Sequence, residues 1–101
     1  MKETVVNVKM SIGIPNKVIS YISKNIEEVI KNKAYSSFIN EVNKKLCYKD
    51  GSQESFLISV ELEKNIIKTV WTWHEECPLF FEVYFDKANN NKVVKVEWFF
   101  D

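Results

Sequence analysis

One short stretch, WTWHEECP at residues 71–78, gathers the side chains best suited to chemistry. It contains the single histidine, His74, and the cysteine Cys77, separated by Glu75 and Glu76. A zinc ion would need three or four ligands of these types, and neither a second histidine nor a paired-cysteine motif occurs elsewhere. A thiol activated by a neighbouring histidine would also need an oxyanion hole, and this turn offers neither a glycine-rich loop nor a helix N-terminus. We therefore predict no metal site, no catalytic residue and no cofactor.

The same stretch is typical of the end of a β-strand. Alternation along residues 66–73 places Trp71 and Trp73 on the side that faces the core, and His74 on the opposite side. Large aromatic rings commonly fill the space between a helix and a sheet. We favour this interpretation, in which residues 74–77 form an exposed turn before Pro78.

Length and composition indicate one globular domain over residues 1–101. Hydrophobic residues make up 46% of the chain and charged residues 28%, a balance typical of folded domains. The chain has 14 basic and 14 acidic residues, and every basic residue is a lysine. Arginine is the favoured side chain for recognising phosphates and bases, so its absence and the zero net charge argue against a nucleic-acid-binding protein.

The chain shows no sign of export or of membrane insertion. Residues 1–10 alternate too early for a secretory signal, and no stretch reaches the roughly 18 uninterrupted apolar residues of a membrane span. We expect a cytoplasmic protein in which Cys47 and Cys77 are free thiols, burial being the commoner state of a free cysteine. The sequence does not show whether the two thiols are close in space.

The periodicity of the apolar residues predicts the order of the elements. Residues 4–12 alternate as a strand, and after Pro15 a helix begins, with Asn16 able to cap its free N–H groups. The helical spacing reaches residue 30 and resumes over 35–46, which predicts either two helices or one helix bent near Asn32. Four further strands follow as an antiparallel meander. Their inward residues are predicted as Phe56, Ile58, Val60 and Leu62, then Ile67, Thr69, Trp71 and Trp73, then Leu79, Phe81, Val83 and Phe85, and finally Val94, Val96, Trp98 and Phe100.

This order predicts the fold class α+β, with the sheet curled around the helical segment because that segment is the only large apolar object available to cover it. The order resembles that of the cystatin-like and nuclear-transport-factor-like folds. The protease-inhibiting cystatins carry a Gln-x-Val-x-Gly hairpin loop and a later Pro-Trp pair. The corresponding turns here read EKN at residues 63–65 and KANNNK at 87–92, so the resemblance does not extend to protease inhibition.

The opposite side of the predicted sheet combines apolar and acidic residues. Its apolar members are predicted as Leu57, Ile66, Val70, Phe80, Tyr84, Val93 and Phe99. A contiguous apolar surface ringed by charge is typical of an interface. We therefore predict a partner-binding face, and its contact residues are Glu61, His74, Glu75, Glu76, Phe80, Glu82, Tyr84, Asp86, Glu97 and Phe99.

From Phe56 on, the chain has eight acidic residues and five lysines. This acidic bias favours a basic protein partner, because complementary charge speeds association. We expect an inhibitor or immunity protein that neutralises a bacterial toxin, for example a basic nuclease domain. Two alternatives remain open. One is a small-molecule-binding or enzymatic domain with a ligand between helix and sheet, and the other is a homodimer that buries the sheet face against its own copy.

Overall fold

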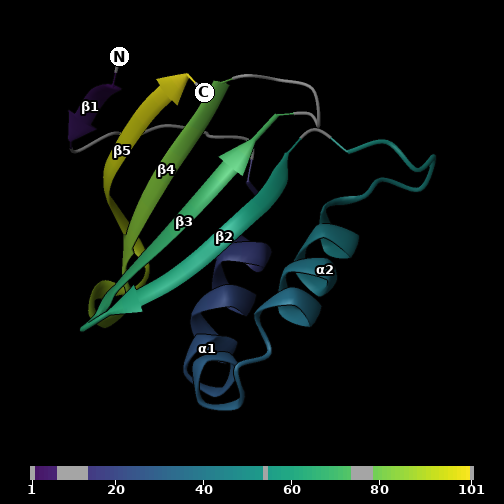
Figure 1. Cartoon of the computed structure of the whole chain (residues 1–101), viewed down its shortest axis with the longest axis horizontal. Helices are drawn as coiled ribbons and strands as arrows, with labels where there is room; N and C mark the ends of the chain where they lie inside the picture. The colour runs from purple at the N-terminus through teal and green to yellow at the C-terminus, as the bar shows by residue number, and fades with distance from the viewer. Residues whose placement is uncertain (1, 7–13, 54, 74–78, 101) are drawn as a thin grey trace.

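The computed structural model describes residues 2–6, 14–53, 55–73 and 79–100, which form a five-stranded antiparallel sheet and two α-helices (Figure 1). The elements are β1 (Lys2–Val6), α1 (Asn16–Asn32), α2 (Tyr35–Leu46), β2 (Phe56–Glu63), β3 (Ile66–Thr72), β4 (Leu79–Asp86), the short 3₁₀ helix η1 (Lys87–Asn89) and β5 (Lys92–Phe100). The strand order is β1-β5-β4-β3-β2, so β1 and β2 are the edges. The predicted α+β class is confirmed. Predicted strand residues 7–12 lie outside the described residues.

The helical segment is two helices rather than one bent helix. α1 ends at Asn32, and Lys33 adopts the left-handed conformation with φ 54°. The N–H of Ala34 donates to the carbonyl of Val29 at 3.0 Å and the N–H of Lys33 to that of Ile30 at 3.2 Å, which closes the last turn and redirects the chain. At the other end Pro15 is the N-cap and no side chain caps the helix, so the prediction that Asn16 does so is wrong.

Two register shifts change the predicted faces of the sheet. In β2 the shift lies between Leu57 and Ser59, so Leu57 is buried at 2% exposure, whereas Ile58 is 46% exposed. The predictions that Ile58 and Phe56 point inward and Leu57 outward are therefore wrong. A bulge adds one residue to a strand, and each added residue reverses the alternation beyond it.

The second shift lies between Tyr84 and Phe85 of β4, where the facing strand β5 has one extra residue. Lys95 pairs with Tyr84 and Val93 pairs with Phe85, so Val94 is the extra residue. Val93 packs against the core. The prediction that Val94 points inward and Val93 outward is wrong for the same reason as in β2.

The core lies between α1, α2 and the inner face of β2 to β5. Among its fully buried side chains are Ile22 and Ile26 of α1, Val42 of α2 and Trp71 of β3. The predicted core position of Trp71 is confirmed. Trp73 also lies on the inner face, with its ring 5.1 Å from that of Phe81, but it is 40% exposed and so lies at the margin of the core.

The predicted asparagine turn is present, whereas Cys47 differs from its predicted burial. Asn90 and Asn91 have φ angles of 53° and 58°, which confirms that the asparagine run forms a turn in the left-handed region. Cys47 is a free thiol as predicted, but it is exposed rather than buried, and its Sγ donates to Oε1 of Gln53 at 3.1 Å. Cys77 lies outside the described residues.

Candidate partner-binding face

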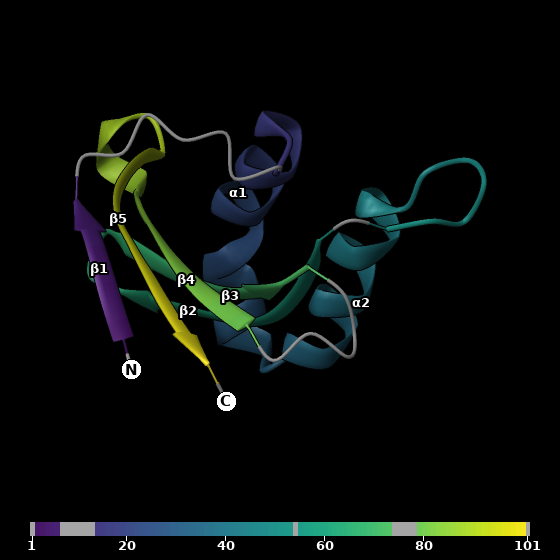
Figure 2. The ribbon, with the colours of Figure 1, turned by 90° about the horizontal axis from the view of Figure 1, so that it is seen from above.

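The sheet has one face that neither helix covers. Figures 1 and 2 show α1 and α2 together on one side of the sheet, and we call the opposite side the outer face. The strand register places these residues on its central strands: Lys68, Val70 and Thr72 from β3, Phe80, Glu82 and Tyr84 from β4, and Lys95, Glu97 and Phe99 from β5.

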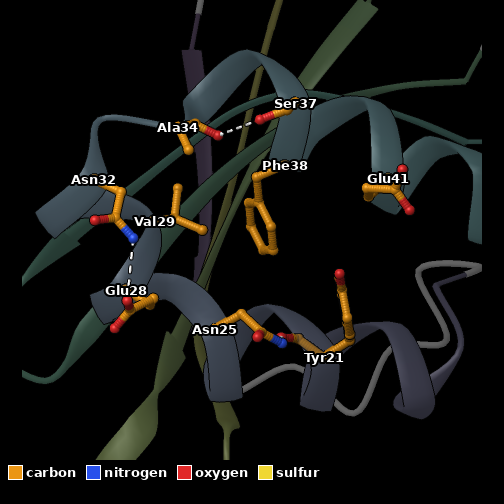
Figure 3. Close-up of a pocket in the computed structure, with 9 residues that line it drawn as sticks. All are labelled: Tyr21, Asn25, Glu28, Val29, Asn32, Ala34, Ser37, Phe38 and Glu41. Atoms are coloured by element: carbon orange, nitrogen blue, oxygen red, sulfur yellow. Dashed lines mark hydrogen bonds between the residues drawn. The ribbon is translucent and has the colours of Figure 1, made fainter.

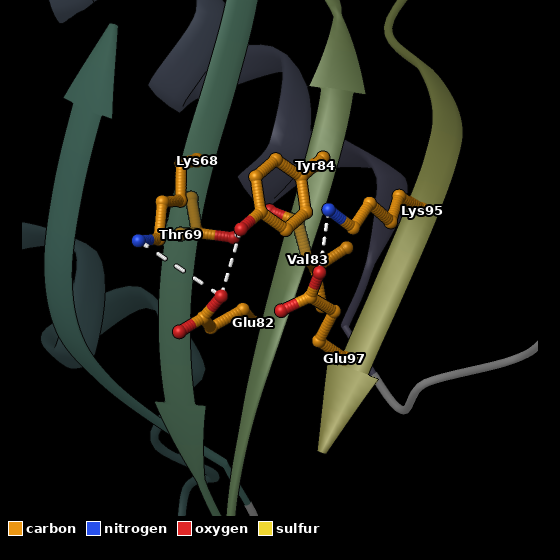
Figure 4. A network of polar contacts seen from close by, with 7 residues as sticks. All are labelled: Lys68, Thr69, Glu82, Val83, Tyr84, Lys95 and Glu97. Carbon is orange, nitrogen blue, oxygen red and sulfur yellow. Dashed lines mark hydrogen bonds and ion pairs between the residues drawn. The ribbon is translucent and has the colours of Figure 1, made fainter. Parts of the chain in front are cut away.

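Two glutamates meet at the centre of the outer face. Glu82 and Glu97 are direct partners across β4 and β5, and they are only 6% and 7% exposed. Like charges placed directly opposite each other destabilise a sheet, and a buried carboxylate needs partners. Lys95 Nζ lies 2.5 Å from Oε1 of Glu97, and Lys68 Nζ lies 3.9 Å from Oε2 of Glu82 (Figure 4). The two carboxylates are thus matched by two lysines of the same face.

Tyr84 completes this polar network. Its hydroxyl donates to Oε2 of Glu82 at 2.7 Å, and Nζ of Lys95 lies 4.8 Å from the centroid of its ring. Figure 4 shows the tyrosine ring between the two lysines. Burial raises the pKa of the Tyr84 hydroxyl above its usual value, and the hydrogen bond to Glu82 and the charge of that carboxylate raise it further.

We expect Tyr84 to ionise at higher pH than an ordinary tyrosine. Because the pKa is raised in the folded state, the protonated hydroxyl of Tyr84 stabilises the fold. This contribution to the free energy of unfolding is complete below the unfolded pKa of about 10 and is lost as the pH rises above it. Absorbance titration at the phenolate band, compared between the native chain and Tyr84→Phe, measures the effect. The difference between the two curves should show one tyrosine that titrates late. A difference centred at pH 10 would contradict the network.

A row of aromatic side chains runs beside the network. Phe80 and Phe99 are stacked, with ring centroids 5.4 Å apart and an interplanar angle of 14°. The register continues this row through Thr72 of β3 to Phe56 of β2. The three phenylalanines are half-buried, whereas Thr72 is 3% exposed. The outer face therefore presents apolar aromatic surface directly beside buried charge.

The structure brings many of the predicted contact residues together. Glu82, Tyr84, Glu97, Phe80 and Phe99 are contiguous on the outer face. Glu61 is exposed on β2 opposite Lys68, and Asp86 is half-buried and accepts the N–H of Ala88 at 3.0 Å. The predicted contacts His74, Glu75 and Glu76 lie outside the described residues.

Two predicted apolar members of this face, Leu57 and Val93, lie on the inner side because of the register shifts. Lys68 also lies on this face, although it is not among the predicted contact residues. Its alternation with Ile66 and Val70 was the signal that placed it on this face. Beside Lys68 and Tyr84, a depression of about 270 Å³ is lined by Glu61, Glu63, Lys64 and Ile66.

A second concavity lies between the two helices (Figure 3). It has a volume of about 240 Å³, and Tyr21 and Phe38 stack within it at 5.7 Å. Several of its polar groups are bonded within the helical segment: Asn25 donates to the carbonyl of Tyr21, and Ser37 donates to that of Ala34. These hydrogen bonds are local to the helices that line the groove.

No family model matches the chain, and no curated protein or solved structure matches it significantly. Neither helix in the described ranges is long and apolar enough to cross a membrane. Within those same ranges, no three His, Cys, Asp or Glu side chains come together as a metal site would require. The described residues define a class only: an α+β domain with a sheet face that neither helix covers and that is both aromatic and charged.

Proposed function

We propose that this chain is a protein-binding module of the inhibitor or immunity type, which neutralises a bacterial toxin in the cytoplasm by binding rather than by catalysis. The observation that carries the proposal is the outer face, on which Phe80 and Phe99 stack beside the charged network of Glu82 and Glu97. An antiparallel sheet that faces water on one side usually presents polar residues there. Aromatic surface in such a place is typical of a binding site.

The charges of the outer face support a partner with basic groups. Glu61 is an exposed carboxylate at the rim, beside the depression that Lys68 and Tyr84 also line. The Lys68–Glu82 contact is long at 3.9 Å, so a basic side chain of the partner could replace Lys68 beside that carboxylate. Complementary charge of this kind speeds association and rejects wrong partners. A basic nuclease domain has the required chemistry.

The fold family is part of the same proposal. The order of one strand, a helical segment and four strands agrees with the cystatin-like and nuclear-transport-factor-like topologies. In these folds the concave face can hold a ligand. Thr69, the polar residue predicted to face inward, is already paired here, since its Oγ1 donates to Val83 and accepts from Nε1 of Trp71. This pairing favours the outer face over the interior as the place of binding.

The test is capture of the partner with outer-face variants. Tagged native chain, Phe80→Ala, Glu61→Lys and the control Tyr35→Ala, an exposed aromatic residue on α2, are each incubated with lysate of the source cells at low and high salt. We expect one stoichiometric basic protein that salt releases. Truncating a central aromatic contact costs about 2 kcal/mol, so Phe80→Ala should bind it about 30-fold more weakly.

Circular dichroism verifies that each variant is folded. Equal retention of the partner by Phe80→Ala, Glu61→Lys and Tyr35→Ala would contradict the proposed face. Recovery of the chain alone, together with a dimer by light scattering that Phe80→Ala dissociates, would replace the toxin partner by a second copy of this chain.

A further inference from the structure

The groove between α1 and α2 combines an apolar floor with an acidic rim (Figure 3). Its volume is about 240 Å³, and Glu28 of α1 and Glu41 of α2 are the charged side chains among the described residues that line it. We propose that this groove binds a linear aliphatic diamine, with one ammonium group beside each glutamate and the carbon chain over the floor. The groove lies on the side of the sheet that carries the helices, so the site does not depend on the toxin-inhibitor function.

The floor of the groove is apolar and aromatic. Val29 is 7% exposed and Phe38 is 5% exposed, and the ring centroids of Tyr21 and Phe38 lie 5.7 Å apart in a stacked pair. A carbon chain that lies over these side chains removes apolar surface from water, and the gain increases with each methylene group. The floor therefore favours a ligand with an apolar body over a hydrated metal ion.

The rim carries one carboxylate from each helix. Figure 3 shows Glu28 and Glu41 at opposite ends of the groove, with the ring of Phe38 between them. Both glutamates are exposed. Glu28 Oε1 accepts Nδ2 of Asn32 at 3.1 Å, and Glu41 Oε1 lies 3.4 Å from Nζ of Lys44. An ionised carboxylate can accept several hydrogen bonds, so each glutamate retains the capacity to accept one from an ammonium group.

The lysines nearest to the groove lie outside its lining, and their contacts show which group this region attracts. The ammonium of Lys44 pairs with Glu41, and that of Lys45 lies 4.5 Å from the centroid of the Tyr21 ring. Carboxylates and aromatic rings both attract ammonium groups. The side chains of Lys44 and Glu41 are 76% and 53% exposed, and such an exposed ion pair is weak enough for a ligand to replace.

The separation of the two carboxylates and the size of the groove select the ligand. Charges at opposite ends are best complemented by a cation at each end of the ligand. The volume of about 240 Å³ lies below the roughly 300–1,000 Å³ of pockets that enclose drug-sized ligands, so the diamine is a short one. Free lysine should bind more weakly than a diamine of the same length, because the acidic rim repels its carboxylate.

Titration of the ¹⁵N-labelled chain with cadaverine, at ionic strength held constant with sodium chloride, tests the groove by NMR. We expect shifts at the amides of Val29 and Phe38 and at the ring protons of Tyr21, with a dissociation constant of about 1 mM. n-Pentylamine has the same carbon chain with one ammonium group and should bind about 5-fold more weakly, the effect of one exposed ion pair. Mg²⁺ carries the same charge as cadaverine without the carbon chain and should not shift the Tyr21 ring.

Three glutamine variants make the result specific. Glu28→Gln and Glu41→Gln each remove one exposed charge of the rim and should weaken cadaverine binding about 3-fold. In the variant that combines both changes, cadaverine should lose its advantage over n-pentylamine. Glu27→Gln is the matched control and should leave binding unchanged. Glu27 precedes Glu28 on α1, but its Oε1 lies 3.2 Å from Nζ of Lys87 in η1, away from the groove.

A change of the competing lysine should have the opposite effect. Lys44→Gln releases the Glu41 carboxylate and should tighten cadaverine binding about 2-fold. The proposal is overturned if cadaverine causes no shifts, if n-pentylamine binds as tightly as cadaverine, if Mg²⁺ causes the same shifts, or if Glu27→Gln weakens binding as much as Glu28→Gln.

Discussion

Replacing Thr69 by valine will lower the free energy of unfolding by about 2–4 kcal/mol, although the two side chains have nearly the same shape. Thr69 and Trp71 are both fully buried. The threonine Oγ1 donates to the carbonyl of Val83 at 2.9 Å and accepts the indole Nε1–H of Trp71 at 2.6 Å. Valine would remove the hydrogen bond to Val83 and leave the buried indole N–H of Trp71 without the threonine oxygen, and this cost is not recovered by the added methyl group.

Urea denaturation followed by tryptophan fluorescence measures the change. Thr69→Ser is the matched control, because it keeps both hydrogen bonds and loses one methyl group, for a cost of about 1 kcal/mol. The prediction fails if valine is tolerated better than serine. In that case the hydrophobic environment of Trp71, and not its hydrogen bond, would determine the stability of this part of the core.

Replacing Asn43 by alanine will lower the free energy of unfolding by about 1–3 kcal/mol and will open the edge of β2. Asn43 lies on α2, and its side-chain amide makes hydrogen bonds to the backbone of the edge strand β2, as a neighbouring strand would. Its Oδ1 accepts the N–H of Leu57 at 2.8 Å, and its Nδ2 donates to the carbonyl of Leu57 at 3.1 Å. Gln53 Nε2 also donates to Oδ1 at 3.1 Å. Alanine removes all three hydrogen bonds.

Two measurements separate the loss of stability from the opening of the edge. Hydrogen exchange should show faster exchange of the Leu57 amide in Asn43→Ala than the global loss of stability explains. Light scattering should show self-association that increases with concentration, because an unpaired edge strand is a template for another chain. Asn40→Ala, an exposed change on the same helix, is the control. Unchanged exchange at Leu57 would show that the side-chain amide does not protect the edge.

Periodicity in the sequence determined the elements and their order. The spacing of apolar residues along 16–30 and 35–46 matches α1 and α2, and the alternation along residues 66–72 matches β3, because helices and strands impose different periods on the residues that they bury. The predicted core position of Trp71 and the asparagine turn before β5 followed from the same local rules. Local rules suffice where the conformation of a residue depends on its neighbours in the chain.

Only the tertiary structure decided the faces at the bulges, the partners of the charges and the shape of the cavities. One extra residue at Ile58 and another at Val94 reversed the predicted sides of Leu57 and Val93, and nothing in the alternation itself marks a bulge. The pairing of Glu82 with Lys68 depends on the register between two strands. The hydrogen bonds between Asn43 and Leu57 depend on how α2 packs against β2. These features depend on long-range packing, so a local pattern of residue types does not contain them.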